Sequence, residues 1–356
     1  MIRDFGWSDA LQAAFAPHAA AGLVPARVVA HHRGLWRLAT QTDECAGRLS
    51  GRFSAEAAPG EHPVVGDWLG IERDGNGDAL IQALMPRKSA FTRRAAGGVG
   101  VQVVASNVDI AFLVAGMNND LNPRRLERYL VAARDSGATP VIVLTKSDLS
   151  TDVESERQAI IDIAAGAPVV TLSALTGDGL SVLDRWLQPG VTAALLGSSG
   201  AGKSTLLNAL AGKALMSTGA VRQADDRGRH TTTHRELFRL PGGALLIDTP
   251  GMRELGLVAD ETALDESFDD IGALMAACKF SDCTHASEPG CAILAALADE
   301  SLSPGRWQSY LKLERELAFV ARKEDPRVEA ANRAQWKKIH KTQRAKYKHR
   351  RDNEEG

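Results

Sequence analysis

Aromatic residues, cysteines and long apolar runs are all scarce in this chain of 356 residues. Aromatic side chains make up 5% of it, and only four residues are cysteine. No apolar run reaches the roughly 18 residues that a membrane-spanning helix needs, so we expect no membrane partner. Asp4 and Asp9 fall where a signal peptide would have its apolar core. We therefore expect a cytoplasmic protein. The composition, 44% hydrophobic and 24% charged residues, is typical of a globular protein.

An excess of charge of either sign is also missing, since the formal net charge is -2. The charge is nevertheless unevenly distributed, because residues 337–351 contain eight Lys or Arg and no acid. A run of like charges is most often a solvated face. Tyr347 lies within this segment and Trp336 directly before it. Eight cations with aromatic residues among them favour binding to the phosphate backbone of a nucleic acid.

Three of the four cysteines lie within fourteen residues. Cys278, Cys283 and Cys291, together with His285, supply three thiolates and one imidazole. Four such ligands fill the tetrahedral shell of a structural zinc ion and leave no open position for catalysis. We expect one structural Zn²⁺ there, the alternative being independent reduced cysteines in a helical region.

Short β-like runs separated by Gly, Asp and Asn turns occupy residues 24–85. They cover 26–30, 64–71 and 79–83. Several short strands in so few residues predict a small β-barrel, most simply an OB-fold, which commonly binds oligonucleotides. A barrel used only as packing or spacer is the alternative.

From about residue 107 the pattern changes to apolar strands that alternate with helices. We expect strands over 108–115, 140–144, 168–172, 193–196 and 244–247. The first helix begins at Pro123 and ends near Gly137. Uniformly apolar short strands between helices predict a doubly wound α/β fold with a buried parallel sheet. Beyond about residue 257 the pattern is mostly helical.

A glycine-rich loop of the form G-x-x-x-x-G-K-[ST] follows the strand 193–196 and begins a helix at Lys203. Such a loop points backbone N–H groups at phosphate oxygens, where the helix dipole also favours an anion. We expect Lys203 to reach the β and γ phosphates and Ser204 to bind Mg²⁺. The expected phosphate-binding residues are Gly197, Ser198, Ser199, Gly200, Ala201, Gly202, Lys203, Ser204 and Thr205.

A base-selecting motif, Thr145-Lys146-Ser147-Asp148, follows the strand 140–144. The Asp148 carboxylate can accept hydrogen bonds from the ring N–H and the amine of guanine, groups that adenine lacks. Lys146 is expected to cover the base, and Ser173 and Ala174 to complete the site for GTP or GDP. Asn is more usual where Thr145 stands, so we expect a weaker side-chain connection to the phosphate loop.

Asp248 and Gly251 form a D-x-x-G motif after the strand 244–247. Asp248 is expected to hold Mg²⁺ and the Gly251 N–H to sense the γ-phosphate. A switch threonine should also bind Mg²⁺; Thr231, Thr232 and Thr233 are the candidates, and Thr232 is favoured.

The residue after Gly251 is Met252, which cannot orient the attacking water as glutamine does in Ras-like GTPases. His230 is the nearest candidate for that catalytic role, beside the magnesium-binding Thr232. Its alternative is a solvated histidine that shapes the loop or contacts RNA.

These motifs stand in an unusual order, because the base motif precedes the phosphate loop. Ordinary GTPases have the phosphate loop first, so the order predicts a circularly permuted GTPase. A metabolic P-loop kinase would not need the base motif. A non-enzymatic RNA scaffold would not need Lys203.

The chain resembles the ribosome small-subunit-dependent GTPase A (RsgA/YjeQ) family over nearly its whole length. The resemblance rests on the permuted order, the Cys-Cys-His-Cys cluster and further short motifs. These are Val65-Gly-Asp67, Arg87, Arg93, Gln102, Asn107-Val-Asp109 and Arg229-His-Thr-Thr-Thr233.

The resemblance implies a cytoplasmic bacterial GTPase that acts late in 30S assembly and is stimulated by the 30S subunit. Its OB-fold and zinc domain would contact 16S rRNA, and we expect a monomer. We expect an N-terminal extension (1–23), an OB-fold barrel (24–90), a circularly permuted GTPase domain (91–256), a zinc-binding helical domain (257–335) and a basic C-terminal tail (336–356).

Overall fold

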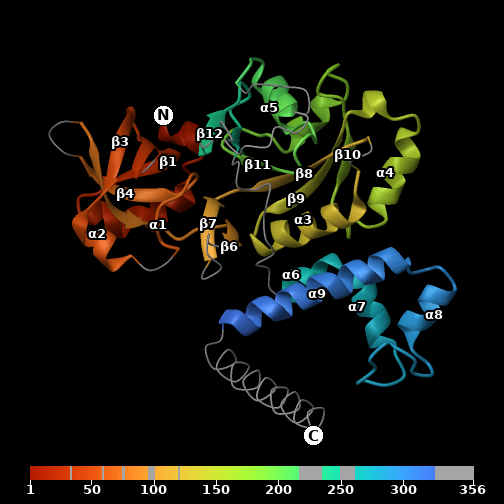
Figure 1. Ribbon diagram of the computed structural model, residues 1–356. Helices are drawn as coiled ribbons and strands as arrows, with labels where there is room; N and C mark the ends of the chain where they lie inside the picture. Colours follow the sequence, from red (N-terminus) through yellow and green to blue (C-terminus); the bar gives the residue numbers. More distant parts are fainter. Residues whose placement is uncertain are drawn as a thin grey trace, which may run out of the picture.

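The computed structural model has three parts, which Figure 1 shows in different colours: a barrel, a central α/β region and a C-terminal group of helices. It describes residues 1–32, 34–57, 60–73, 77–94, 101–118, 121–215, 235–248 and 261–324. Among these residues, no helix has the length and apolar character that crossing a membrane requires.

The barrel is built from five strands and confirms the OB-fold prediction. The strands are β1 (Val24–His32), β2 (Leu35–Ala39), β3 (Glu44–Leu49), β4 (Trp68–Arg73) and β5 (Ala79–Leu84). They follow the order β1-β2-β3-β5-β4, and β4 pairs back onto β1, so the barrel closes. The short helices around it are η1 (Ile2–Phe5), α1 (Asp9–Ala20) and α2 (Gly51–Glu56). Leu38, Leu69 and Ile81 are fully buried in the barrel core.

The central region contains the predicted parallel sheet. Its parallel strands are β8 (Ile110–Gly116), β9 (Thr139–Thr145), β10 (Val169–Thr171), β11 (Thr192–Leu196) and β13 (Leu245–Asp248), in the order β10-β9-β8-β11-β13. The intervening elements are α3 (Pro123–Asp135), η2 (Ser147–Leu149), α4 (Val153–Ile161), η3 (Leu180–Arg185) and α5 (Lys203–Ala211). From β8 the chain proceeds to β9 and β10 on one side, then returns to β11 on the other. The topological switch point therefore lies between the carboxyl ends of β8 and β11, and open α/β sheets bind ligands at such a point.

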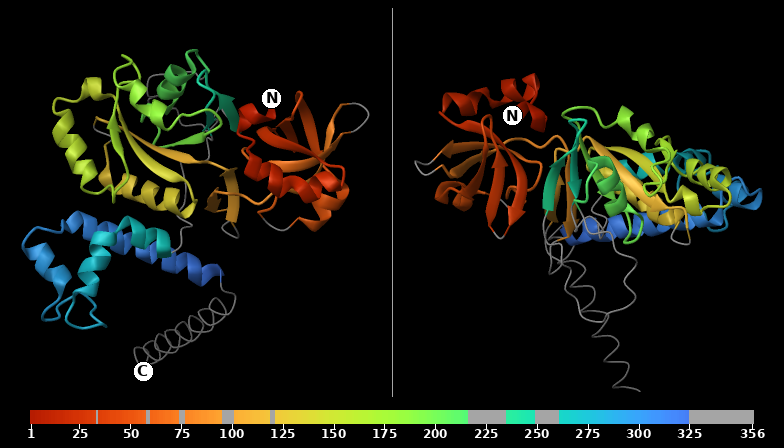
Figure 2. Two further views of the ribbon diagram at one scale, coloured as in Figure 1. Left: turned by 180° about the vertical axis from the view of Figure 1, so that it is seen from behind. Right: turned by 90° about the horizontal axis from the view of Figure 1, so that it is seen from above.

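The sheet is covered on both faces, as a doubly wound fold requires. Leu113 of β8 shares a core with Leu130 of α3, whereas its neighbour Phe112 shares a core with Leu206 of α5. This alternation follows from the period of two along a strand. Figure 2 shows α3 and α5 on opposite sides of the sheet.

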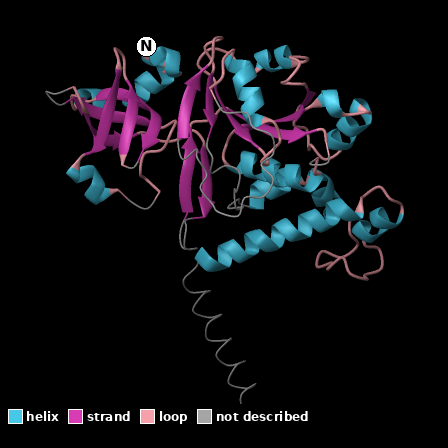
Figure 3. Cartoon of the chain, turned by 45° about the horizontal axis from the view of Figure 1, so that its top comes forward, coloured by secondary structure: helices cyan, strands magenta, loops and turns pink. Residues whose placement is uncertain are grey.

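Strand β12 (Arg235–Arg239) joins the barrel to the α/β region, which the sequence did not predict. It pairs antiparallel with β13 on one side and with β1 on the other. Arg37 of β2 adds an ion pair to Glu236 of β12. The two regions therefore share one hydrogen-bonded sheet, while β6 (Ala90–Arg94) and β7 (Val101–Ser106) form a separate two-stranded sheet beside it (Figure 3).

Arg27 of β1 is the most deeply buried cation at this joint, with a relative exposure of 2%. It donates hydrogen bonds to the Phe5, Gly66 and Asn107 carbonyls and to the Thr192 hydroxyl, the last at 2.9 Å. Its guanidinium also stacks 4.8 Å from the Trp68 ring centroid. Burial lowers the pKa of Arg27 to about 10, so the side chain remains charged at neutral pH. One side chain thus connects the N-terminal segment, the barrel and β11.

The N-terminal segment also approaches the α/β region through two glycines. A Cβ on Gly6 would lie 2.6 Å from the Gly190 carbonyl oxygen, closer than real contacts allow. Gly6 has φ +87°, which glycine adopts at little cost. The sequence therefore permits a backbone-to-backbone contact that larger residues would prevent.

The C-terminal part consists of α6 (Glu261–Ser267), α7 (Asp269–Ala276), α8 (Ala292–Ala298) and α9 (Pro304–Glu324). It packs on α3, whose Val131 shares a core with Phe268 and Leu313. Arg306 of α9 donates to Glu127 of α3 at 2.8 Å and to Asp270 of α7 at 2.6 Å. This buried ion pair fixes the helices against the α/β region, and Figures 1 and 2 show α9 running beside α3.

We expect Arg27→Lys to lower the free energy of unfolding by about 2–4 kcal/mol, because a lysine leaves buried carbonyl groups without donors. Urea unfolding of the full chain measures this. The matched control is Arg52→Lys, since Arg52 is an exposed α2 residue with a side-chain exposure of 82%. An Arg27→Lys protein as stable as the control would contradict the assigned role.

Candidate functional site

The nucleotide motifs all follow parallel strands at the same edge of the sheet. The base motif begins at the end of β9, the Ser173 loop follows β10, and the phosphate loop follows β11. Asp248 is the last residue of β13. Because these strands are parallel neighbours, their carboxyl ends meet at one edge despite the permuted order.

The phosphate loop lies directly over the end of β8. A Cβ on Gly197 would lie 2.3 Å from the Val114 carbonyl oxygen, so this position requires glycine. Gly202 caps α5 in the left-handed conformation, and Lys203, Ser204 and Thr205 are the first residues of that helix. The remaining loop residues, Ser198, Ser199, Gly200 and Ala201, connect β11 to Gly202.

Lys203 is buried at 7% exposure and lies among the loop carbonyls. Its Nζ donates to the Gly197 carbonyl at 2.7 Å and to the Ser198 carbonyl. The ammonium is thus held inside the loop that, in P-loop proteins, surrounds the phosphates. A bound phosphate would supply oxygens to the same cation.

Thr145 connects the base motif to the phosphate loop through its side chain, and that this connection is weaker than an asparagine's stays a prediction. Its hydroxyl donates to the Ala201 carbonyl at 2.6 Å, and its exposure is 1%. The Thr145 carbonyl accepts a hydrogen bond from the Met117 amide at 2.8 Å. The short side chain suffices because the two loops already lie in contact, with Thr145 Oγ1 only 3.1 Å from a Cβ built on Gly202.

The rest of the base motif forms the turn η2. Lys146 has a left-handed φ of 60°, and Asp148 is exposed at the surface. The Ser147 amide donates to the Leu172 carbonyl at 3.3 Å, which joins this turn to the Ser173-Ala174 loop. The buried Ser173 hydroxyl accepts from the Thr176 amide at 3.2 Å and shapes that loop. The structure thus brings the predicted base residues together.

Asn118 is a candidate that the sequence analysis missed. Its side-chain oxygen would lie 2.9 Å from a Cβ on Gly116, which would also lie 3.3 Å from Lys146 Cδ. An amide therefore stands beside the lysine stem at the same edge. The sequence could have indicated this residue, because Asn118 is the first polar residue after β8.

Several predicted residues lie outside the described part of the chain. They are His230, Thr231, Thr232, Thr233, Gly251 and the basic segment 337–351, together with the side chain of Asp248.

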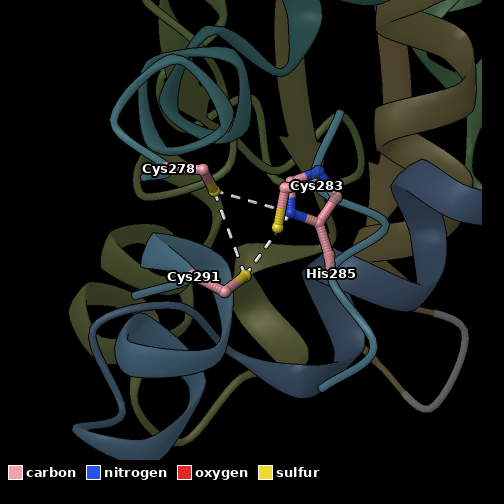
Figure 4. A group of neighbouring side chains, drawn as sticks. All are labelled: Cys278, Cys283, His285 and Cys291. Atoms are coloured by element: carbon pink, nitrogen blue, oxygen red, sulfur yellow. Dashed lines mark hydrogen bonds between the residues drawn. The ribbon is translucent and has the colours of Figure 1, made fainter. Parts of the chain in front are cut away.

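The four predicted metal ligands converge in the C-terminal part (Figure 4). One ligand atom from each of Cys278, Cys283, His285 and Cys291 lies within 4.8 Å of the others. Cys278 Sγ is 3.9 Å from Cys291 Sγ and 3.6 Å from His285 Nδ1. Four ligands at bond lengths of about 2.0–2.3 Å around one tetrahedral ion are separated by nearly these distances. The cluster therefore fits a single ion with a closed shell.

The loop that carries the ligands is organised by Glu288, another residue that the sequence analysis missed. Its carboxylate accepts hydrogen bonds from the amides of Thr284, Ala286 and Ser287, each at 3.0 Å. A hydrogen bond from the Thr284 hydroxyl, followed by those from the Ser287 and Thr284 amides, lowers the pKa of Glu288 to about 2. His285 packs edge-on against Trp307 of α9 at 5.7 Å, which links the loop to the helical core.

Known proteins resemble this chain along nearly its whole length. A family model described as RsgA GTPase matches residues 84–258. The chain is 50% identical to the small ribosomal subunit biogenesis GTPase RsgA of Opitutus terrae over 97% of both chains. The chain belongs to the RsgA GTPase family. The small ribosomal subunit biogenesis GTPase RsgA of Syntrophotalea carbinolica is 43% identical over 95% of both chains.

Solved structures agree with this membership. YjeQ from Thermotoga maritima is 26% identical, with a TM-score of 0.62 over 83% of this chain and 99% of that one. YloQ, described as a circularly permuted GTPase, is 25% identical, with a TM-score of 0.59 over 83% of this chain and 95% of that one. The chain is thus a permuted GTPase, a GTP hydrolase, and the metabolic kinase and the non-enzymatic scaffold are excluded.

We expect Thr145→Val to weaken GDP binding about five- to tenfold, because one buried hydrogen bond between the base motif and the phosphate loop is lost. Thr145→Ser keeps the hydroxyl and is the matched control. Fluorescent GDP titration compares the three proteins. Equal affinities of the valine and wild-type proteins would show that the Thr145–Ala201 bond does not support the nucleotide site.

We expect purified protein to carry one zinc ion per chain. Cys283→Ser removes a direct ligand and should weaken zinc retention by more than the roughly 10- to 100-fold that follows loss of a ligand's hydrogen-bond partner. Elemental analysis after incubation with a chelator measures retention. Cys45→Ser is the control, because Cys45 is a free cysteine of β3 outside the cluster. Metal loss that is equal in both variants, or no zinc in the wild type, would count against the assignment.

Proposed function

We propose that this chain is a GTPase that binds the 30S ribosomal subunit, is stimulated by it and acts late in assembly of that subunit. The observation that carries the proposal is that the nucleotide motifs meet at one edge of the sheet. The chain that carries them is 50% identical to a protein named small ribosomal subunit biogenesis GTPase. We propose in addition that the protein is cytoplasmic and monomeric.

In the proposed nucleotide complex, the phosphate-loop amides of residues 197–205 bind the phosphates and Lys203 reaches the β and γ oxygens. Asp148 selects guanine, Lys146 covers the base, and the Ser173 and Ala174 backbone completes the pocket. Two contacts support this assignment: Lys203 is buried against the phosphate-loop carbonyls, and the Thr145–Ala201 bond joins the base motif to that loop.

Mg²⁺ fits the same edge, where Ser204, Thr232 and Asp248 would hold it and Gly251 would bond to the γ-phosphate. The cation would offset negative charge on the phosphates. The support is positional, since Ser204 lies in the first turn of α5 and Asp248 ends the adjacent strand β13.

We propose that Zn²⁺ occupies the Cys278–Cys283–His285–Cys291 cluster and has a structural role. The OB-fold barrel, the zinc-binding part and the basic segment 337–351 would contact 16S rRNA. The cations of that segment support this through electrostatic attraction to phosphates, which weakens as salt rises.

The decisive experiment compares GTP turnover of the full chain alone, with purified 30S subunits and with purified 50S subunits. The proposal requires stimulation by 30S subunits and none by 50S subunits. Equal rates in all three conditions would overturn the ribosomal part while leaving the family membership intact.

We expect Asp148→Asn to weaken GTP binding and to favour xanthine nucleotide, whose ring presents the opposite hydrogen-bonding group. The loss corresponds to about 1.5–3 kcal/mol for each charge-assisted hydrogen bond. Competition between GTP and XTP measures the preference. Asp162→Asn is an exposed control at the end of α4, and an unchanged preference for GTP in Asp148→Asn would refute the role.

We expect His230→Ala to bind GTP and 30S subunits normally but to lose about a hundredfold or more of the stimulated rate, the scale of general acid–base catalysis. His234→Ala changes a histidine in the same segment and is the control. Full 30S-dependent turnover in His230→Ala would assign water positioning to another group.

A further inference from the structure

A cavity of about 830 Å³ lies at the junction of the N-terminal segment, the barrel and the α/β region. Its lining includes Asn107 and Asp109, just before β8, and Thr192, the first residue of β11. They mark the amino ends of β8 and β11, whereas the phosphate loop follows the carboxyl end of β11. The cavity therefore lies at the opposite edge of the sheet from the guanine site, and its volume is typical of small-ligand pockets.

One wall of the cavity carries a stacked arginine and tryptophan. The Arg185 guanidinium lies 3.8 Å from the Trp186 ring centroid, and the half-buried Trp186 packs edge-on against Phe112 at 6.4 Å. A guanidinium is flat and has two faces, so an arginine stacked on a tryptophan can stack a base on its other face. Arg185 is exposed at the cavity wall.

Another part of the cavity lining is apolar and closely packed. Trp7 and Trp68 pack edge-to-face at 5.0 Å and are 5% and 3% exposed. Arg27 stacks on Trp68 and bonds to both the N-terminal segment and β11, so it fixes this wall against β11. This wall is thus held by packing and hydrogen bonds within the protein.

Cations exceed acids among the charged residues of the lining. Arg3, Arg27, Lys88 and Arg185 line the cavity, against the single carboxylate of Asp109. Arg3 pairs with Asp9 and Lys88 with Asp109, but both cations are 72% exposed, and exposed ion pairs contribute little free energy. Both can therefore turn toward an anion at small cost.

We propose that this cavity binds a nucleotide, with its base stacked on Arg185 and its phosphate beside Arg3 and Lys88. Flat apolar walls and an excess of cations match the two halves of that ligand class. The source is either a free mononucleotide or an unpaired nucleotide of an RNA strand. The proposal does not rest on the ribosomal function or on the guanine site.

The test uses the full chain with its guanine site saturated with GDP and Mg²⁺. AMP is titrated by calorimetry, and a fluorescently labelled single-stranded oligoadenylate is titrated by anisotropy at physiological ionic strength. We expect Arg185→Glu to weaken the bound probe about tenfold, the range of a lost stacking contact. Arg157→Glu on α4, at the outer edge of the sheet, makes the same charge change and should have little effect.

Each outcome decides one point. Competition between AMP and oligoadenylate for the Arg185-dependent site indicates a free-nucleotide pocket, and binding of oligoadenylate alone indicates an RNA residue. The proposal is overturned if the wild-type protein binds neither AMP nor oligoadenylate. It is also overturned if Arg185→Glu and Arg157→Glu weaken binding of the probe equally. Displacement of the probe by an acidic peptide as effectively as by unlabelled oligoadenylate overturns it too.

A second variant guards against misfolding. Arg3→Glu changes an exposed residue at another wall and should weaken the same probe while GDP affinity and the melting temperature stay unchanged. Loss of probe binding in Arg185→Glu without any loss in Arg3→Glu would contradict the phosphate position. Turnover stimulated by 30S subunits is measured separately, so failure here is distinguishable from failure of the proposed function.

Discussion

The parallel pairing of β10, β9, β8, β11 and β13 is the constraint on which the nucleotide site depends. Parallel strands present their carboxyl ends at one edge, so loops that follow them meet whatever their order in the chain. Here the base motif comes before the phosphate loop in sequence, yet Thr145 donates directly to Ala201. A circular permutation therefore leaves the edge intact, because it changes the connections and preserves the strand neighbours.

The expected switch segment leads directly into the joint between the barrel and the α/β region. Only His234 separates residues 231–233 from β12, which pairs with β13 and with β1 of the barrel. The segment that carries the expected switch threonines is thus covalently continuous with the strand that joins the two regions. Arg27 and the Gly6–Gly190 contact hold the same joint at the amino end of β11. Buried, specific contacts therefore position the barrel on the α/β region.

Much of the fold and of the site follows from local sequence patterns. The five apolar strands, the helix that begins at Pro123 and the Cys-His cluster were predicted because each has a short-range signature in period, capping or ligand type. Strands β2 and β3 were missed, β2 because it is only five residues long and β3 because its polar and small residues lack a clear apolar run. The pairing of β1 with β12 was unpredictable because it joins residues about two hundred positions apart.

Within the site, too, some features follow from local sequence and others depend on long-range packing. That Thr145 binds the phosphate loop depends on how closely two loops approach, and residue type alone does not encode that distance. The burial of Arg27 likewise depends on four acceptors from separate segments of the chain. Local signals identify which residues gather at an edge, and tertiary packing decides their bonds.

Nucleotide titration of the purified full chain tests most directly whether the permuted motifs form one guanine site. Calorimetry with GTP, GDP and ATP in the presence of Mg²⁺ compares the three ligands on the same protein. The account predicts one site per chain that binds GTP and GDP and discriminates strongly against ATP. Equal binding of ATP, or no binding of guanine nucleotide, would contradict it.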